Sequence, residues 1–573
     1  MKCNSVILLA VCLLLSVRVA YSQSNFVDRA TDLGIGVSCG DVPIGNGISF
    51  YDYNSDGWDD VTLATQAGDP IRFFKNVNGV FQEETLNIPI NTSQIKQINW
   101  VDYDNDGHID LYATSNISGN KLYRNDGSFN FSDVTSESQL PTTNIFTYGA
   151  SWGDYNNDGF LDVFLSNRDV ALVVPNYLYR NNGDGTFTNV SEIAGIINTG
   201  NLSFCSAFFD FNNDGWQDIY VSKDRIENKN ILYKNNGDGT FSDVSEASNT
   251  DLYIDAMSVT IEDYNSDGWL DIYVTNTQEG NVFLQNNGDE TFTNVAITNG
   301  TTFNSIAWGA VFLDAENDMD LDLYVSGLLD GSNPNFLSAA LYENDGNGNF
   351  TIPSEGFIND TGESYANAIG DVDNDGFPEI VVANADNEHV FLWKNEAASV
   401  NNWLKVKLEG IQSNKNGVGS FIEIAINGEK QYRYTLCGEG YLAQNSGTEV
   451  FGLGTNSTID YIKVTWLSGL VDEITNVSAN QLLTIVEGSN PLSNNEYSIE
   501  PIKLIPNPVE DVLKIISREP VETIEVYNSI GQLILQLNQN KIEYINMSQF
   551  KSGLYMVKLI TNQQTKTEPI LKR

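Results

Sequence analysis

Short runs of alternating apolar and polar residues recur over residues 23–397 and predict β-strands rather than helices. Around residues 150–190, one run precedes a polar loop and a second (DVFL) follows it. A third run (YLYRN) comes next, and a Gly-Asp-Gly turn leads to a fourth run that begins at Phe187. Such turns between strands are hairpin signals. A four-stranded unit that repeats about every fifty residues is typical of a β-propeller blade.

Each unit carries a polar loop between its first two strands, and the loop at Asp154 reads DYNNDGFLD. Side-chain oxygens occupy positions 1, 3, 5 and 9, and Gly159 at position 6 permits a sharp turn. Seven such loops, here called loops 1–7, start 50, 52, 56, 53, 51 and 57 residues apart. They begin at Asp52, Asp102, Asp154, Asp210, Asp263, Asp314 and Asp371. This regular period indicates a repeat architecture.

Converging hard oxygens in a tight loop favour calcium, as in the EF-hand, although here the last carboxylate stands at position 9 rather than 12. A lone loop of this kind would more often be an ordinary Asp-rich turn. Seven loops at one spacing instead predict about five to seven structural calcium sites. The predicted ligands are Asp52, Asn54, Asp56 and Asp60; Asp102, Asp104, Asp106 and Asp110; Asp154, Asn156, Asp158 and Asp162; Asp210, Asn212, Asp214 and Asp218; Asp263, Asn265, Asp267 and Asp271; Asp314, Glu316, Asp318 and Asp322; and Asp371, Asp373, Asp375 and Glu379.

Loop 6 departs from the pattern. Glu316 stands at position 3, and Met319 replaces the glycine at position 6, where a positive φ is costly for a side chain. Occupancy of this loop by a cation therefore stays open. Loop 7 differs less, since it ends in Glu379 instead of aspartate.

The two ends of the array predict a closed ring. The seventh unit has a third strand but neither the Gly-Asp-Gly turn nor a fourth strand, whereas residues 26–35 align without gaps with residues 187–196 of the third unit. We therefore predict that the N-terminal segment supplies the last strand of the seventh unit. The expected fold is all-β, with a seven-bladed β-propeller whose closure removes exposed sheet edges.

The Phe/Trp-x-Asp-x-Asx-x-Asp-Gly-x-x-Asp loops resemble the FG-GAP/VCBS repeats of integrin α-subunit propellers and of cartilage acidic protein, over residues 25–397. The resemblance implies calcium in hairpins on one face of the propeller and ligands on the other. The blocks NWLKVKLEG, SNKNGVG, FGLG and VTWLSG follow in order within residues 401–488 and resemble an ASPIC/UnbV domain, as in bacterial relatives of cartilage acidic protein. This region reads as a small β-domain without metal-ligand or nucleophile spacing.

Residues 489–500 read as a polar linker. After it, the blocks LIPNP, VYNSIGQ and SGLY lie within residues 501–573 and resemble a type IX secretion C-terminal sorting domain, which is also β-rich. The propeller is thus expected to precede two small β-domains. This resemblance implies the type IX secretion machinery of a Gram-negative bacterium, and a protein that is secreted or held at the outer cell surface.

The net charge and the N-terminal segment restrict the partners and the location that the sequence predicts. The 573-residue chain has a formal net charge of −46, which argues against a nucleic-acid partner. Lys2, an apolar run over residues 6–17 and small residues before Gln23 predict a signal peptide at residues 1–22. That run is too short for a membrane anchor, and no transmembrane segment is predicted elsewhere. The three remaining cysteines, Cys39, Cys205 and Cys437, read as buried residues rather than a disulfide framework.

Three functions remain open. The first is a non-catalytic binding or adhesion module for an extracellular glycan, matrix or protein ligand; the second is a polysaccharide lyase or glycoside hydrolase; the third is a scaffold without a dedicated ligand. The only two histidines, His108 at position 7 of loop 2 and His389, lie in no catalytic motif and have a structural or surface role in this interpretation. Longer connections at residues 167–175 and 327–336 should project opposite the loops and could carry recognition. The favoured reading is a calcium-binding module, not an enzyme.

Overall fold

The computed structural model of the chain describes residues 24–490 and 503–573, apart from short gaps at residues 90–92, 143–144, 197–201, 330–331, 334, 354–356, 358–359, 398, 506, 517–519, 522, 529–530, 539–541, 543 and 562–564. The predicted signal peptide and most of the predicted linker lie outside these residues. The described residues fall into two compact units, which divide at residues 491 and 492. None of the described helices is long and apolar enough to cross a bilayer.

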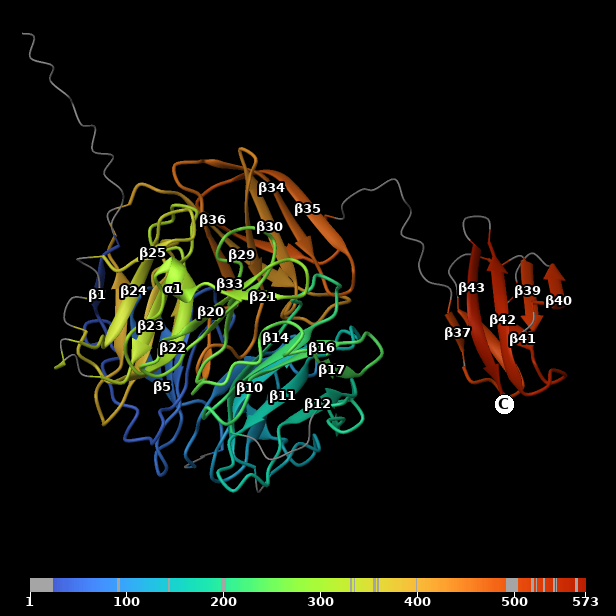
Figure 1. The fold of residues 1–573 in the computed structure, drawn as a ribbon, viewed down its shortest axis with the longest axis horizontal. Coiled ribbons are helices and arrows are strands. Elements are labelled where there is room, and N and C mark those ends of the chain that lie inside the picture. The colour runs from blue at the N-terminus through green and yellow to red at the C-terminus, as the bar shows by residue number, and fades with distance from the viewer. Residues whose placement is uncertain are drawn as a thin grey trace, which may run out of the picture. The chain divides into compact units, whose positions relative to one another are not determined.

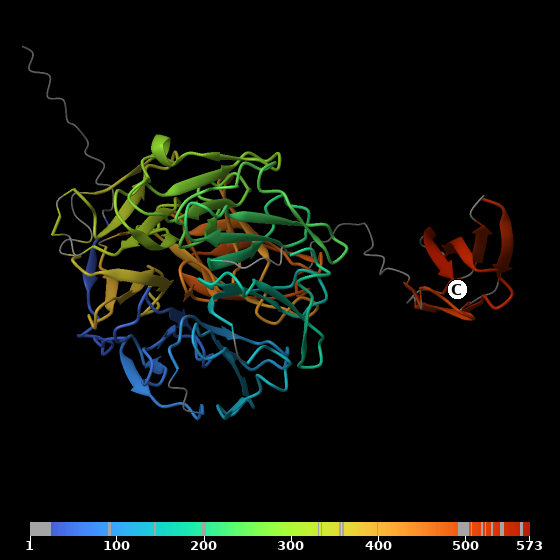
Figure 2. The same ribbon diagram turned by 60° about the horizontal axis from the view of Figure 1, so that its bottom comes forward.

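Seven antiparallel sheets, here called sheets 1–7, contain the predicted strands, and sheet n carries loop n between its first two strands. Figures 1 and 2 show them in blue to yellow around a common centre, in a propeller-like fold that we call the ring. The strands are β2 (Ile48–Tyr51), β3 (Asp60–Leu63), β4 (Arg72–Asn76) and β5 (Phe81–Glu84); β6 (Ile98–Val101), β7 (Asp110–Ala113), β8 (Lys121–Asn125) and β9 (Phe131–Asp133); β10 (Thr147–Gly153), β11 (Asp162–Asn167), β12 (Tyr177–Asn181) and β13 (Phe187–Asn189); β14 (Ser203–Phe209), β15 (Asp218–Lys223), β16 (Ile231–Asn235) and β17 (Phe241–Asp243); β18 (Thr260–Glu262), β19 (Asp271–Val274), β20 (Val282–Asn286) and β21 (Phe292–Asn294); β22 (Ala307–Leu313), β23 (Asp322–Gly327), β24 (Ala339–Asn344) and β25 (Phe350–Thr351); and β26 (Ser364–Gly370), β27 (Glu379–Asn384), β28 (Phe391–Asn395) and β1 (Phe26–Asp28).

Burial falls from the centre of each sheet towards its outer edge. The second strands, such as β11, are buried along their whole length, because neighbouring sheets cover both of their faces. The fourth strands, such as β13, bury only their first residue. A single-turn helix, α1 (Ala296–Asn299), follows β21. The continuous apolar second strands and the alternating outer strands thus have different environments within the same repeat.

The predicted N-terminal strand is confirmed. β1 pairs antiparallel with β28, with Phe26 opposite Asn395, and so completes sheet 7. A further bridge joins the backbone of Ser38 to that of His389. The first strand of the ring therefore belongs to its last sheet. In this position β1 supplies the fourth strand of sheet 7 and pairs the edge of β28 that would otherwise be exposed.

The predicted second domain forms two sheets of its own, drawn in orange in Figure 1. One contains β29 (Trp403–Glu409), β33 (Thr448–Gly452) and β36 (Gln481–Val486); the other contains β30 (Phe421–Ile426), β31 (Glu429–Tyr434), β34 (Thr458–Thr465) and β35 (Val471–Ser478). The two sheets enclose a core that includes Leu404, Ile424 and Trp466. These residues belong to the same compact unit as the ring, which the sequence did not indicate.

Part of the second domain enters the middle of the ring. Residues 437–446, here called the central segment, include β32 (Ala443–Gln444), which pairs in parallel with β2. Tyr441 and Leu442 are fully buried in the central cluster, beside Phe204 of sheet 4 and Trp308 of sheet 6. The centre of the ring is thus filled by a segment of the chain itself.

The C-terminal unit is β-rich, as predicted. One sheet contains β37 (Lys503–Ile505), β38 (Val512–Ile516) and β41 (Tyr544–Asn546); the other contains β39 (Thr523–Asn528), β40 (Leu533–Asn538), β42 (Gly553–Ile560) and β43 (Thr565–Lys572). An apolar core that includes Leu513, Val526 and Val557 lies between them. The unit therefore has a core independent of the ring.

Candidate metal centres

Every loop is built around the carboxylate at position 1. In loop 3, Oδ1 of Asp154 accepts a hydrogen bond from the backbone N–H of Asp158 at 3.0 Å, and Oδ2 accepts one from Gly159 at 2.8 Å. The same two bonds recur in the other loops, and all fourteen lie between 2.7 and 3.2 Å. The backbone thus fixes the position-1 carboxylate in one orientation throughout the array.

Two residues in each loop adopt left-handed backbone conformations. Position 6 has φ between 84° and 89°, which confirms the predicted role of glycine there, and Met319 adopts the same angle at 89°. Position 4, always asparagine or serine, has φ between 54° and 58°. The sequence reasoning missed position 4, although the recurring asparagine was a signal, because asparagine tolerates this region better than most residues.

The carboxylate at position 9 is anchored by the third strand of its own sheet. Oδ1 of Asp162 accepts a hydrogen bond from the backbone N–H of Asn181 at 2.7 Å, and five other loops repeat this bond at 2.7–2.9 Å. The second oxygen accepts the backbone N–H of position 2 in loops 3, 4 and 6 at 3.0–3.2 Å, whereas Asp110 Oδ2 and Asp271 Oδ2 have no hydrogen-bond partner. In loop 7 the longer Glu379 instead accepts from Val372 N–H at 2.7 Å.

Several buried ligand oxygens have no hydrogen-bond partner. Among the described residues these are Asp104 Oδ1, Asp110 Oδ2, Asn212 Oδ1, Asp271 Oδ2, Glu316 Oε1, Asp373 Oδ1 and Glu379 Oε1. In loops 2 and 7, oxygens of three carboxylates lie within 4.8 Å of one another. Basic side chains compensate part of this charge, since Arg124 Nε lies 2.8 Å from Asp104 Oδ2, and Lys394 Nζ lies 2.8 Å from Asp373 Oδ2 and 3.6 Å from Glu379 Oε1. A buried carboxylate oxygen without a hydrogen-bond partner is still costly. The donor set of hard oxygens, with these atoms unpartnered, therefore fits a divalent cation that prefers oxygen ligands.

Burial of the loop carboxylates raises their pKa values, which also favours a bound cation. Loss of hydration raises the pKa of Asp60 to about 8 and that of Asp110 to about 9, and it raises the pKa of Asp162 well above its usual range. Neighbouring carboxylates in each loop raise these pKa values further. A bound cation would offset both effects, because an opposite charge favours the ionised form.

Neighbouring loops are joined around the ring. The position-4 asparagine donates its side-chain N–H to the carbonyl of the position-6 glycine in the next loop. These bonds join Asn105 to Gly159 at 2.6 Å, Asn157 to Gly215 at 2.9 Å, and Asn213 to Gly268, Asn317 to Gly376 and Asn374 to Gly57 at 3.0 Å. The last bond joins loop 7 to loop 1. Loops 1 and 5 have serine at position 4.

The second domain covers part of the loop face. Lys415 N–H donates to Asn105 Oδ1 at 3.1 Å, and Lys407 Nζ lies 3.4 Å from Asp52 Oδ2. Met319 of loop 6 packs against the core of the second domain, and Gly454 N–H donates to Asn317 O at 2.8 Å. The unusual side chain of loop 6 thus serves domain docking.

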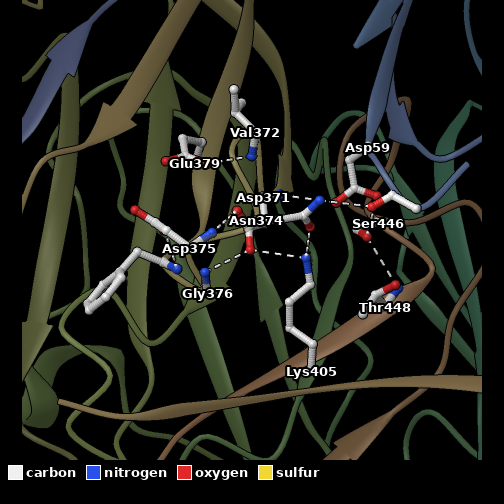
Figure 3. A network of polar contacts seen from close by, with 12 residues as sticks. Asp59, Asp371, Val372, Asn374, Asp375, Gly376, Glu379, Lys405, Ser446 and Thr448 are labelled. Atoms are coloured by element: carbon white, nitrogen blue, oxygen red, sulfur yellow. Dashed lines mark hydrogen bonds and ion pairs between the residues drawn. The ribbon is translucent and has the colours of Figure 1, made fainter. Parts of the chain in front are cut away.

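Loop 7 has the closest connection to the second domain (Figure 3). The buried Lys405 places Nζ 3.0 Å from Asp371 Oδ2 and 2.8 Å from Asn374 Oδ1. On the other side, Asp59 Oδ2 accepts the backbone N–H of Asp371 at 3.0 Å, and its Oδ1 accepts Ser446 Oγ–H at 2.8 Å. Sequence reasoning named neither Lys405 nor Asp59, because both act through contacts between distant segments.

The other candidates from the sequence lie away from these centres or have structural roles. His108 and His389 have exposed side chains, as predicted. Cys39, Cys205 and Cys437 are buried and free, as predicted. The long connection after β11 lies at the end of the sheet opposite loop 3, and exposes Val170 and Val173. Its counterpart at residues 327–336 is only partly described.

The fold and its loops define a propeller-like repeat protein whose loops are rich in the oxygen ligands that suit a cation. The model for the FG-GAP-like repeat matches residues 52–113, 102–165, 166–221, 210–274, 263–325 and 330–382, which together exceed half of the chain. The chain belongs to the FG-GAP-like repeat family. The model for ASPIC and UnbV matches residues 410–492, and the secretion system C-terminal sorting domain matches residues 503–573. This last match indicates export by type IX secretion, to the cell surface or beyond.

Known relatives cover only part of the molecule. Cartilage acidic protein 1 of Xenopus tropicalis is 26% identical over 278 residues, covering 45% of this chain and 41% of the relative. Its Homo sapiens counterpart is 23% identical over 282 residues, covering 46% of this chain and 41% of the relative. The chain therefore spans less than half the length of these curated relatives. The BP39L lectin from Burkholderia pseudomallei has a TM-score of 0.40 at 11% identity, covering 61% of this chain and 96% of that one, a likeness too weak to bear on ligands.

Proposed function

We propose that this protein is an exported, non-catalytic binding module whose seven-bladed propeller is stabilised by calcium in about five to seven loops. The observation that carries the calcium assignment is the set of buried loop oxygens without hydrogen-bond partners, in loops whose backbone already fixes the other ligands. Loops 2 and 7 are the strongest sites, because three of their carboxylates converge within 4.8 Å. When bound, calcium would supply positive charge to carboxylates that otherwise repel one another.

Closure of the ring supports seven blades. The hydrogen bond from Asn374 to Gly57 O places loop 7 beside loop 1, and the β1–β28 pairing joins the first strand to the last sheet. The central segment contacts sheets on every side of the centre. A solenoid with free ends would need none of these three contacts.

A binding role is favoured over catalysis because the carboxylates of the loops are committed to their own backbone. Position-1 and position-9 oxygens accept loop or strand N–H groups, which leaves few of them free as a general acid and base. Both side chains of the histidines are exposed; His108 stands at position 7 of loop 2, and His389 lies outside the loops. The sorting domain would then deliver the module to an extracellular glycan, matrix polymer or protein.

The calcium assignment is tested by thermal unfolding of the full chain in excess EGTA, in calcium and in magnesium, with bound calcium counted by elemental analysis. Each site at a hundredfold excess of ligand over its dissociation constant adds about 2.7 kcal/mol of stability. We expect a large drop in melting temperature in EGTA that calcium reverses and magnesium restores poorly. An unchanged unfolding curve in EGTA, or no calcium in excess of the buffer after equilibrium dialysis at millimolar calcium, would refute the assignment.

The binding role is tested by incubating the full chain with polysaccharides and measuring both retention and reducing-end or unsaturated products. Retention without products is expected. Product release would assign catalysis instead, and would direct attention to carboxylates outside the loops.

A further inference from the structure

Neighbouring loops are connected by two kinds of hydrogen bond, and both kinds are missing at the same two junctions. The first kind runs from the position-4 asparagine of one loop to the position-6 carbonyl of the next loop. It joins loops 2 and 3, 3 and 4, 4 and 5, 6 and 7, and 7 and 1. Loops 1 and 5 have Ser55 and Ser266 at position 4, and among the described residues neither serine makes this bond.

The second kind of bond runs in the opposite direction around the ring. The asparagine that ends the third strand of a sheet donates its side-chain N–H to the position-2 carbonyl of the preceding loop. All five bonds of this kind measure 2.8 Å, and they join Asn181 to Tyr103, Asn235 to Tyr155, Asn286 to Phe211, Asn395 to Ala315 and Asn76 to Val372. They connect the same five pairs of neighbouring units as the first kind.

Units 2 and 6 keep this asparagine but use it differently. Asn125 and Asn344 also end third strands, yet their side-chain N–H groups donate at 3.1 Å to Ile109 O and Leu321 O, which are position-8 carbonyls of their own loops. In the described part of the chain, neither asparagine bonds to the preceding loop. The loops therefore fall into two groups: loops 2–5, here called the long arc, and loops 6, 7 and 1, here called the short arc.

Two further bonds lie within the arcs and end on the residue at position 1. Asp154 N–H of loop 3 donates to Gln217 Oε1 of loop 4 at 2.7 Å, and Asp371 N–H of loop 7 donates to Asp59 Oδ2 of loop 1 at 3.0 Å. Positions 4 and 6 flank the N–H groups that hold the position-1 carboxylate. Bonds between loops within an arc thus attach to the same peptide units that shape each predicted cation site.

We propose that the loops bind their cations as two cooperative groups, the long arc and the short arc. The proposal rests on the calcium sites proposed above and adds how they are coupled. A cation that orders one loop also orders the groups that bond to the next loop, so the next loop loses less conformational entropy when its own cation binds. Both kinds of bond are missing between the arcs, so a cation in one arc leaves the affinity of the other nearly unchanged.

The second domain offers a competing route between the arcs. Lys405 and Lys407 contact loops 7 and 1 of the short arc, whereas Asn416 Oδ1 accepts the backbone N–H of Asp102 in loop 2 at 3.1 Å. If this route carried the coupling, all seven loops would respond together. The test therefore compares loops of the two arcs in the same molecule.

The experiment is hydrogen–deuterium exchange of the full chain, measured by mass spectrometry over a calcium titration. Peptides that contain positions 5 and 6 of each loop report its state, because these N–H groups bond to the position-1 carboxylate. Asp158→Ala removes a predicted ligand of loop 3 in the long arc. Asp375→Ala removes the equivalent ligand of loop 7 in the short arc, so each variant is the control for the other.

Each substitution should weaken calcium binding only within its own arc. In Asp158→Ala, the calcium concentration that half-protects loops 2 and 4 should rise by about fivefold or more, whereas that of loop 1 should change by less than about twofold. In Asp375→Ala, loop 1 should show the larger rise and loops 2 to 5 the smaller change.

A third variant tests the bond between loops while every predicted ligand is kept. Asn157→Ser gives loop 3 the residue of loops 1 and 5, where Ser55 and Ser266 adopt the same left-handed conformation with φ of 58° and 57°. In this background, Asp158→Ala should shift the calcium midpoint of loop 4 by at least about twofold less than it does alone. Ser266→Ala, which removes no bond between loops, should leave that shift unchanged.

The outcomes separate this proposal from the calcium assignment. Equal shifts in all seven loops would overturn the two arcs and assign the coupling to the second domain or to the ring as a whole. Shifts confined to the substituted loop would show independent sites and would also overturn the arcs. Both results would leave calcium binding intact, whereas a wild-type chain whose exchange does not respond to calcium would overturn the calcium assignment and the arcs with it.

Discussion

Replacement of Gln444 tests whether the central segment holds the ring together. Its Oε1 accepts the backbone N–H of Trp100 at 2.7 Å and Ser49 Oγ–H at 2.9 Å, and its Nε2 donates to Trp100 O at 2.7 Å. Gln444 is 2% exposed, so water cannot replace these bonds freely. Gln444→Ala leaves three buried polar groups without this partner, at about 1–3 kcal/mol each. With partial relaxation we expect a loss of roughly 3–6 kcal/mol of unfolding free energy.

This loss can be converted into a melting temperature. At about 2.1 cal/mol/K per residue, a unit spanning residues 24–490 unfolds with an entropy of about 1 kcal/mol/K. The melting temperature should therefore fall by roughly 3–6 °C. Differential scanning calorimetry of the full chain in calcium measures it, with the exposed Gln412→Ala as control, for which we expect less than about 1 °C.

A second variant separates hydrogen bonding from packing. Gln444→Met keeps nearly the same volume but removes all three bonds, so most of the loss should persist. If Gln444→Ala melted within about 1 °C of the Gln412→Ala control, the central segment would not be held in the ring, and the argument would fail.

Three further predictions follow from the loops and the central segment. Asp158→Ala should speed amide hydrogen exchange in sheet 3 while leaving sheet 6 unchanged; equal acceleration in both would contradict local cation binding. Asn374→Ala removes the bond to Gly57 O and the acceptor of Lys405, and should lower the melting temperature by about 1–3 °C more than Ser55→Ala, which changes position 4 of loop 1 without such a bond. Burial raises the pKa of Glu439 to about 8, so the folded state holds a proton that the unfolded state loses near pH 4.5, and stability falls as pH rises between these values. Glu439→Gln should therefore raise the melting temperature more at pH 8 than at pH 5, and an equal change at both would refute the assignment.

The sequence predicted the features that depend on local pattern. A loop of nine residues contains nearly all the information for its own shape, because its carboxylate at position 1 bonds to the backbone of positions 5 and 6. The alternating pattern also predicted the strands, and the absence of a fourth strand in the seventh unit predicted that the N-terminal segment completes it. The pairing of Phe26 opposite Asn395 agrees with that prediction. The calcium itself stays a prediction, since these observations establish the geometry of the loops and not a bound ion.

The features that were missed depend on contacts between distant segments. Residues 437–446 have the glycines and polar residues of an ordinary loop, and only the surrounding ring makes Tyr441 a core residue. Lys405 lies on β29, whose apolar and polar residues alternate as in an ordinary strand, so the residues beside it in the sequence did not indicate its contact with Asp371. Met319 looked like a defect in a metal loop, whereas its side chain packs into the second domain.

The loops and the second domain form one connected system. Lys405 and Lys407 of β29 approach the position-1 carboxylates of loops 7 and 1, and those two loops are themselves joined by the bond from Asn374 to Gly57 O. A cation in either loop would draw on the same carboxylates, so its removal should alter both the loop and the seat of the second domain.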